Sequence, residues 1–127
     1  MSAKLRDYLR GVSSITARDC EAAQQLAASA RAELAGWFTS FDILMTPGAP
    51  DVALPGFDSI GPSTFNRLWT LLGMPCINVP GALGEGGYPM GLQLIAPHGS
   101  DALLMGVAAA LEQNLQPTLR MSLKPVL

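Results

Sequence analysis

The sequence predicts an α/β fold, with a small mixed sheet of about three strands and helices packed on it. Two long segments, 17–38 and 101–113, repeat apolar residues at the spacing of one helix face. Three short apolar runs, at 42–46, 76–80 and 88–96, have the length of strands. Helical and strand-like segments are interleaved along the chain, which is typical of an α/β layer.

The N-terminal part predicts two helices. Lys4–Arg10 is a short amphipathic segment, and Gly11 is suited to end it. Thr16 and Asp19 have the spacing of a capping box, which predicts the start of a helix that continues to about Phe38. The apolar residues that keep the helical period, and that we expect to be buried, are Ala23, Leu26, Ala27, Ala30, Leu34, Trp37 and Phe38.

The middle of the chain predicts a strand, a loop and a helix. Asp42–Thr46 is a short apolar run that prolines follow. Residues 47–62 are rich in proline and glycine and predict a long surface loop of the kind that often carries function. Phe65–Leu72 repeats apolar residues at helical spacing. Gly73 supplies a stop for this helix, and Pro75 prevents it from resuming.

Two further runs predict a β-hairpin-like pair. Cys76–Pro80 has Ile77 and Val79 on one side, and Tyr88–Ala96 is a second strand beyond a glycine-rich turn. Gln93 is the only amide in this second strand, which is otherwise apolar. A sheet of three strands has two free edges, which predicts self-association or the addition of strands across protomers.

The last helix begins at a clear signal. Ser100 is a good N-cap, and Asp101 suits the first turn because the helix dipole favours negative charge there. The period predicts a helix to about Gln113 and a tail over 116–127. The residues expected on its buried side are Leu104, Val107, Ala108 and Leu111.

Composition narrows the possible functions. The 127 residues form at most one domain, 1–127, and only 14% are charged, against about 25% in an average soluble domain. This low charge predicts that part of the surface is buried against additional polypeptide or another protomer.

A net charge of -2 disfavours nucleic acid as a partner, and the absence of a long apolar run disfavours a membrane. The N-terminus lacks the apolar core of a signal peptide. Cys20 and Cys76 are far apart and indicate reduced thiols in a cytoplasmic protein.

None of the candidate catalytic, metal-binding or phosphate-binding motifs in the sequence predicts catalysis. His98, Ser100 and Asp101 lie on one turn, whereas a catalytic triad converges from separate elements. A single histidine and two separated cysteines do not make a zinc site, so no metal or cofactor is expected. Both cysteines are expected to pack in the core. The glycine-rich segment 81–87 lacks the lysine of a phosphate-binding loop and is interpreted as a turn.

Four segments occur in an order that resembles the C-terminal part of amidase signature family enzymes. They are FDILMTPGAP (41–50), WTLLGMPCINVPG (69–81), YPMGLQLIAP (88–97) and GSDALL (99–104). The similarity extends from about Leu5 to Glu112 and covers nearly the whole chain. The resemblance implies a fragment of a hydrolase that acts on carboxamide C–N bonds through a Ser, cis-Ser, Lys arrangement.

The resemblance also implies that the catalytic residues are absent. Family members carry the serines in an upstream Gly-Gly-Ser-Ser-Gly-Gly-type segment, and no such run occurs here. Lys4 and Lys124 are the only lysines. We therefore expect a C-terminal segment that supplies scaffold and part of the substrate pocket, and that is inactive alone. Its partner would be the N-terminal part of the amidase, with a small-molecule amide as substrate of the full enzyme. The alternative is a non-catalytic, self-associating binding or assembly module.

Phe65, Trp69 and Thr70 are the candidate residues of a substrate pocket. The resemblance implies that the helix matching Phe65–Leu72 lies beside the substrate cleft. Trp69 and Thr70 match positions at which many members have a small residue and asparagine. The helical spacing of Phe65 and Trp69 equally predicts simple core packing. The loop from Thr46 to Ile60 is a further candidate to cover the same cleft.

Overall fold

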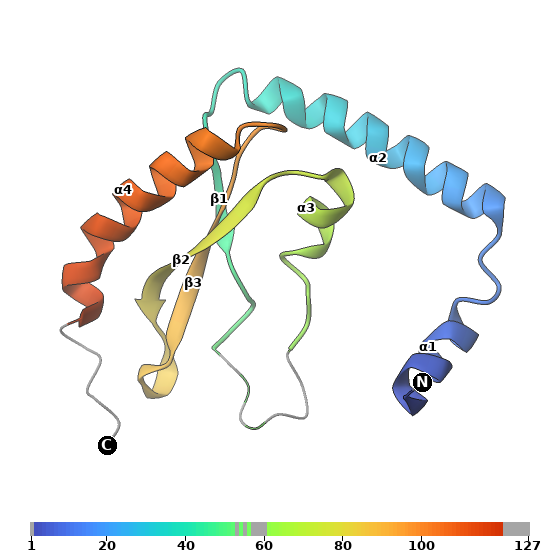
Figure 1. Cartoon of the computed structure of the whole chain (residues 1–127), viewed down its shortest axis with the longest axis horizontal. Coiled ribbons are helices and arrows are strands. Elements are labelled where there is room, and N and C mark those ends of the chain that lie inside the picture. Colours follow the sequence, from blue (N-terminus) through green and yellow to red (C-terminus); the bar gives the residue numbers. More distant parts are fainter. Residues whose placement is uncertain (1, 53, 55, 57–60, 121–127) are drawn as a thin grey trace.

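A computed structural model describes residues 2–120, apart from 53, 55 and 57–60. The described chain forms an open arch of helices around a small sheet (Figure 1). Its elements are α1 (Ala3–Gly11), α2 (Ala17–Trp37), β1 (Leu44–Pro47), α3 (Arg67–Leu72), β2 (Cys76–Leu83), the 3-10 turn η1 (Glu85–Gly87), β3 (Pro89–Ile95) and α4 (Asp101–Arg120). The predicted α/β class and its three strands are confirmed.

The sheet has the strand order β1-β3-β2, and both pairs are antiparallel. The predicted hairpin is confirmed, because β2 and β3 pair from Cys76 with Ile95 to Leu83 with Pro89. The expected mixture of parallel and antiparallel pairs is wrong for the described sheet. A short turn forces β2 and β3 to run in opposite directions, and β1 joins the other edge of β3.

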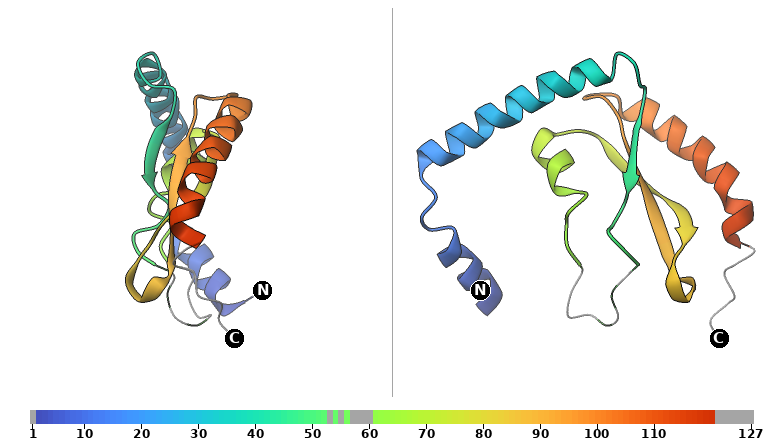
Figure 2. Two further views of the ribbon diagram at one scale, coloured as in Figure 1. Left: turned by 90° about the vertical axis from the view of Figure 1, so that its left-hand side faces the viewer. Right: turned by 180° about the vertical axis from the view of Figure 1, so that it is seen from behind.

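One face of the sheet is covered by α4, as Figure 2 shows in its edge-on view. The buried residues between them are Val79, Leu94, Ala96, Leu104 and Ala108. Val107 and Leu111 pack against this cluster, so the predicted buried side of α4 is confirmed. We call this side of the sheet the α4 face.

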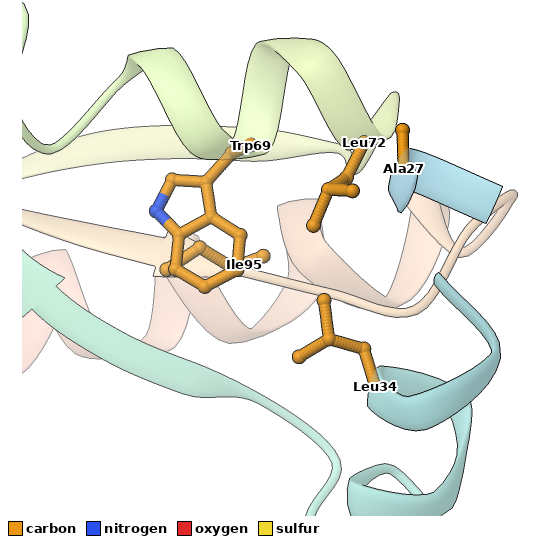
Figure 3. Close-up of a cluster of buried hydrophobic side chains, with 5 residues drawn as sticks. All are labelled: Ala27, Leu34, Trp69, Leu72 and Ile95. Atoms are coloured by element: carbon orange, nitrogen blue, oxygen red, sulfur yellow. The ribbon is translucent and has the colours of Figure 1, made fainter. Parts of the chain in front are cut away.

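The opposite face packs against α2 and α3. Ile95 follows Leu94 in β3 and therefore points to the other side of the sheet. It lies with Ala27 and Leu34 of α2 and with Trp69 and Leu72 of α3 (Figure 3). This second cluster holds the three elements together on that side.

The link between α2 and α3 also has a polar part. Arg31 of α2 donates from Nε to the carbonyl of Leu72 (2.9 Å) and from NH2 to the carbonyl of Leu71 (3.1 Å). These carbonyls lie in the last turn of α3, where a cation is favoured by the helix dipole. Gly73 follows in the left-handed conformation (φ 65°) and ends α3 as predicted.

Much of α2 lies beyond the sheet, and this overturns part of its predicted burial. Only Ala27 and Leu34 are buried in α2, whereas Leu26 is 72% exposed and Trp37 51% exposed. Cys20 is also exposed, so its expected core position is wrong. Cys20 and Leu26 belong to the N-terminal half of α2, which extends away from the sheet together with α1 (Figure 1), whereas Trp37 is the last residue of the helix.

Two helix boundaries differ from the prediction. α3 starts at Arg67, two residues after the expected Phe65. α4 continues to Arg120, so the expected tail is wrong for residues 116–120, and 121–127 lie outside the described residues.

Both outer strands contain a proline. Gly48 N donates to Gly91 O (2.9 Å), and Ala96 N donates to Pro75 O (3.1 Å). Because main-chain groups alternate in direction along a strand, Pro47 of β1 and Pro80 of β2 have their nitrogens on the outer edges of the sheet. Each free edge therefore lacks an N–H donor at its proline.

The capping box at the start of α2 is present. Thr16 N and Thr16 Oγ1 both donate to the Asp19 carboxylate (2.8 and 2.7 Å), and Asp19 N donates to Thr16 Oγ1 (3.2 Å). The bond from the Thr16 main chain, followed by that from its hydroxyl, holds the pKa of Asp19 below its ordinary value of 3.8.

This lowered pKa predicts an acid-sensitive helix start. The ionised carboxylate is favoured more in the folded than in the unfolded state, so its contribution is complete above the unfolded pKa. It is lost as the pH falls through the lower folded-state pKa. We expect the Tm gap between the native chain and Asp19→Ala, followed by circular dichroism from about pH 5 to about pH 2, to narrow as the pH falls. A gap that stays constant would contradict this role.

Candidate functional site

A row of polar side chains crosses the face of the sheet opposite α4. Thr46 of β1, Gln93 of β3 and Asn78 of β2 are partners in the strand register and therefore share one face. We call these three residues the polar row. Asn66, directly before α3, reaches the same place from above the sheet, because its side chain bonds that of Gln93.

Gln93 is the centre of this row. It is only 5% exposed, and its Nε2 donates to Asn66 Oδ1 at 2.6 Å. Its Oε1 accepts a bond from Thr46 Oγ1 at 3.2 Å. A buried amide without partners is costly, so these two bonds explain how an amide is tolerated in an apolar strand. The bonds also fix the start of α3 over the sheet.

The predicted pocket residues do not converge on one site. Trp69 is 9% exposed and packs in the cluster with Ile95 (Figure 3). It also lines a shallow apolar hollow of about 180 Å³ between α2 and α3, together with Trp37 and Leu68. Phe65 is half-buried and does not line this hollow. Thr70 is exposed, and its hydroxyl donates to the carbonyl of Asn66 (2.9 Å).

A larger cavity of about 350 Å³ lies at the other end of the same face, beyond the polar row. Its described walls come from the segment after β1, from β2 and from the start of β3. They include Gly48, Asp51, Asn78, Met90 and Gly91. The predicted loop at 47–62 contributes to these walls, although part of it lies outside the described residues.

Sequence reasoning missed the partners of Gln93. Gln93 stood out as a lone amide, but Thr46, Asn66 and Asn78 carried no signal of their own. The register β1-β3-β2 was needed to place Thr46 and Asn78 on either side of Gln93. A polar residue at the matching position of each predicted strand is the pattern that could have indicated this row.

The reactive side chains elsewhere are not arranged for catalysis. Cys76 is exposed because β2 is an outer strand, so its expected core position is wrong. Partial burial of its thiol raises the pKa of Cys76 above the ordinary value of 9.0, which disfavours the reactive thiolate. His98 is exposed on a turn, and no bond among the described residues links it to Ser100 or Asp101.

The described residues contain no group of three or more His, Cys, Asp or Glu side chains that could hold a metal ion. Within residues 2–120, apart from the gaps at 53, 55 and 57–60, no helix has both the length and the hydropathy to cross a bilayer.

The sequence is similar to amidases and to amidotransferase subunits. No protein-family model matches the sequence. The putative amidase AmiA2 of Mycobacterium tuberculosis is 38% identical in an alignment of 89 residues that covers 57% of this chain and 18% of that protein. A glutamyl-tRNA(Gln) amidotransferase subunit of Granulibacter bethesdensis is 33% identical over 109 residues, 80% of this chain and 22% of that protein.

Solved structures agree on the fold. A bacterial aryl acylamidase of the amidase signature family matches 99% of this chain with a TM-score of 0.75 and 21% identity. The chain is similar to the C-terminal part of amidase signature family enzymes. The corresponding glutamyl-tRNA(Gln) amidotransferase subunit of Thermotoga maritima matches 86% of this chain, with a TM-score of 0.66 and 26% identity. These two matches cover 29% and 26% of the solved chains.

The chain corresponds to the C-terminal part of such an enzyme. It spans about a fifth of the length of the curated relatives that it matches, 18% of the first and 22% of the second. The predicted resemblance is therefore confirmed.

Proposed function

We propose that the chain is a scaffold and pocket-wall segment of an amidase-type hydrolase that acts on carboxamide C–N bonds, and that it is inactive alone. The proposal rests on one alignment, which covers most of this chain but only a small part of the relative. The relative from Granulibacter bethesdensis matches 80% of this chain, whereas the chain supplies only 22% of that relative. The partner in this proposal is the remaining N-terminal part of the enzyme.

The chemistry of the described side chains supports inactivity. Covalent hydrolysis by a serine needs a base within hydrogen-bonding distance of its hydroxyl. Ser13 Oγ and Ser29 Oγ instead donate to the main-chain carbonyls of Arg10 and Gln25. In the part of the chain that the structure describes, no serine hydroxyl donates to a basic side chain. The expected contribution is therefore structural and limited to shaping a pocket.

An ammonia-release assay tests this proposal. We expect the purified chain to release no ammonia from benzamide or propionamide above the rate of a protein-free blank. The matched positive control is a full-length amidase signature enzyme under the same conditions. Ammonia release that is abolished by an active-site serine reagent would contradict the proposal, because it would require a nucleophile and a base within this chain.

The alternative function is a self-associating binding or assembly module without catalysis. It is favoured by the large apolar side chains that the described structure leaves exposed on the outer helices. These include Tyr8, Leu26, Trp37, Leu68 and Leu71. Trp37 and Leu68 line one hollow between α2 and α3, and exposed apolar residues that lie side by side favour association.

Self-association is tested by size-exclusion chromatography with light scattering. We expect a dimer or larger species at micromolar concentration, because association removes these side chains from water. Leu26→Gln with Trp37→Gln should shift the chain toward monomer, while Arg18→Gln, an exposed change on the same helix, should not. A clean monomer of the native chain at micromolar concentration would remove support from the alternative.

A further inference from the structure

The first helix has an apolar side that is exposed. Leu5, Tyr8 and Leu9 are three or four positions apart and therefore share one side of α1. We call these three residues the α1 stripe. All three are exposed, because α1 lies beyond the far end of α2 and away from the sheet (Figure 1). A helix of nine residues is marginal in water by itself, so α1 needs a surface against which its stripe can pack.

The hollow between α2 and α3 is an apolar surface of matching size. Its volume is about 180 Å³, and an apolar cavity of about 150 Å³ holds a benzene ring. The hollow therefore has room for a leucine side chain or an aromatic ring. None of the described residues that line it belongs to α1. Apart from Glu33, the described lining is apolar and consists of Ala30, Leu34, Trp37, Leu68, Trp69 and Leu72.

The charges of the two surfaces are complementary. Residues 1–12 carry three basic side chains and one acidic side chain, whereas residues 13–127 carry five basic and nine acidic side chains. Arg6 is three positions from Leu9 and therefore borders the α1 stripe. Glu33 is the only charged residue in the described lining of the hollow. Opposite charges at the rim of an apolar contact speed encounter and fix the register of the two surfaces.

We propose that two copies of this chain exchange their N-terminal helices, with the α1 stripe of each copy seated in the α2–α3 hollow of the other. Each copy supplies one helix and one hollow, so the exchange fills both hollows in a closed two-fold dimer. Residues 12–16, between α1 and α2, form the connection that directs α1 toward the second copy. The proposal rests on the self-association alternative and names its surfaces, and it is independent of any release of ammonia.

A sample mixed from isotope-labelled and unlabelled copies tests the exchange. NMR spectra filtered for contacts between labelled and unlabelled copies should link the methyl groups of Leu5 and Leu9 to the indole rings of Trp37 and Trp69. A helix folded back on its own chain gives no such signal. A dimer by light scattering that lacks these contacts would overturn the exchange and leave self-association in place. A monomer at micromolar concentration would overturn both, and the proposed role as an amidase segment would be untouched.

Variants of α1 and of the hollow test the same contact by the dimer Kd. Leu5→Gln with Leu9→Gln should raise this Kd at least about ten-fold, because two leucines lose their apolar burial. Asp7→Asn, on the opposite side of α1, should change it less than about two-fold. Arg6→Glu and Glu33→Arg should each raise it about three-fold, and the two changes together should restore it. An unchanged Kd in the leucine variant with a native-like circular dichroism spectrum, or no recovery in the charge-exchanged pair, would contradict the proposal.

Discussion

Replacement of Trp69 by alanine is expected to lower the free energy of unfolding by about 3–5 kcal/mol. Trp69 is 9% exposed and contacts the cluster in which β3, α2 and α3 meet (Figure 3). Truncation would remove its apolar contacts and leave a cavity that the sheet beneath cannot fill. Domains of this size are stable by about 5–15 kcal/mol, so the loss would be a large part of the total. Urea unfolding followed by circular dichroism measures it.

The second tryptophan of the chain is a matched control. Trp37 is 51% exposed at the end of α2. Trp37→Ala deletes the same atoms from a surface position, and we expect it to cost less than about 1 kcal/mol. Equal losses for the two variants would show that Trp69 is not a core residue of the folded chain. A small loss at Trp69 alone would favour the pocket role that the family resemblance implies.

The second large effect is expected at Gln93. Gln93→Met keeps the length of the side chain but removes both hydrogen bonds of its amide. The change leaves Asn66 Oδ1 without its 2.6 Å donor and the Thr46 hydroxyl without its acceptor on Gln93. Removal of one partner from a buried polar contact costs about 1–3 kcal/mol, and we expect a loss in this range. Denaturant unfolding and hydrogen exchange at the start of α3 measure it.

Thr46→Val is the control for the network around Gln93. Valine has the shape of threonine. The change removes the 3.2 Å bonds from Thr46 Oγ1 to Gln93 Oε1 and to Pro47 O, and it leaves the 2.6 Å bond between Gln93 and Asn66 in place. We expect a loss of about 1 kcal/mol and little change in hydrogen exchange before α3. If Gln93→Met is no less stable than the native chain, the buried amide does not fix α3 to the sheet.

Local signals in the sequence predicted the elements that form through neighbouring residues. Thr16 and Asp19 indicated the start of α2 because a capping box needs only residues three apart. Gly73 indicated the end of α3, and the short turn between two apolar runs indicated the hairpin of β2 and β3. In each case the physical cause lies within a few residues.

Features that depend on distant contacts were harder to predict. The period of α2 marked Leu26 and Trp37 as buried, but only Ala27 and Leu34 of this helix are buried in the described core. The apolar run around Cys76 suggested a core position, yet β2 lies at an edge. The site was hidden for a similar reason, because Asn78 reaches Gly48 only after β1 and β2 have paired with β3.

The prolines on the outer strands have a consequence for how copies of this chain would assemble. A fibre of stacked strands grows only if every newcomer offers the next one a full row of donors and acceptors. Pro47 and Pro80 interrupt that row on opposite margins of the sheet. Strand-by-strand stacking of copies through these two edges is therefore disfavoured.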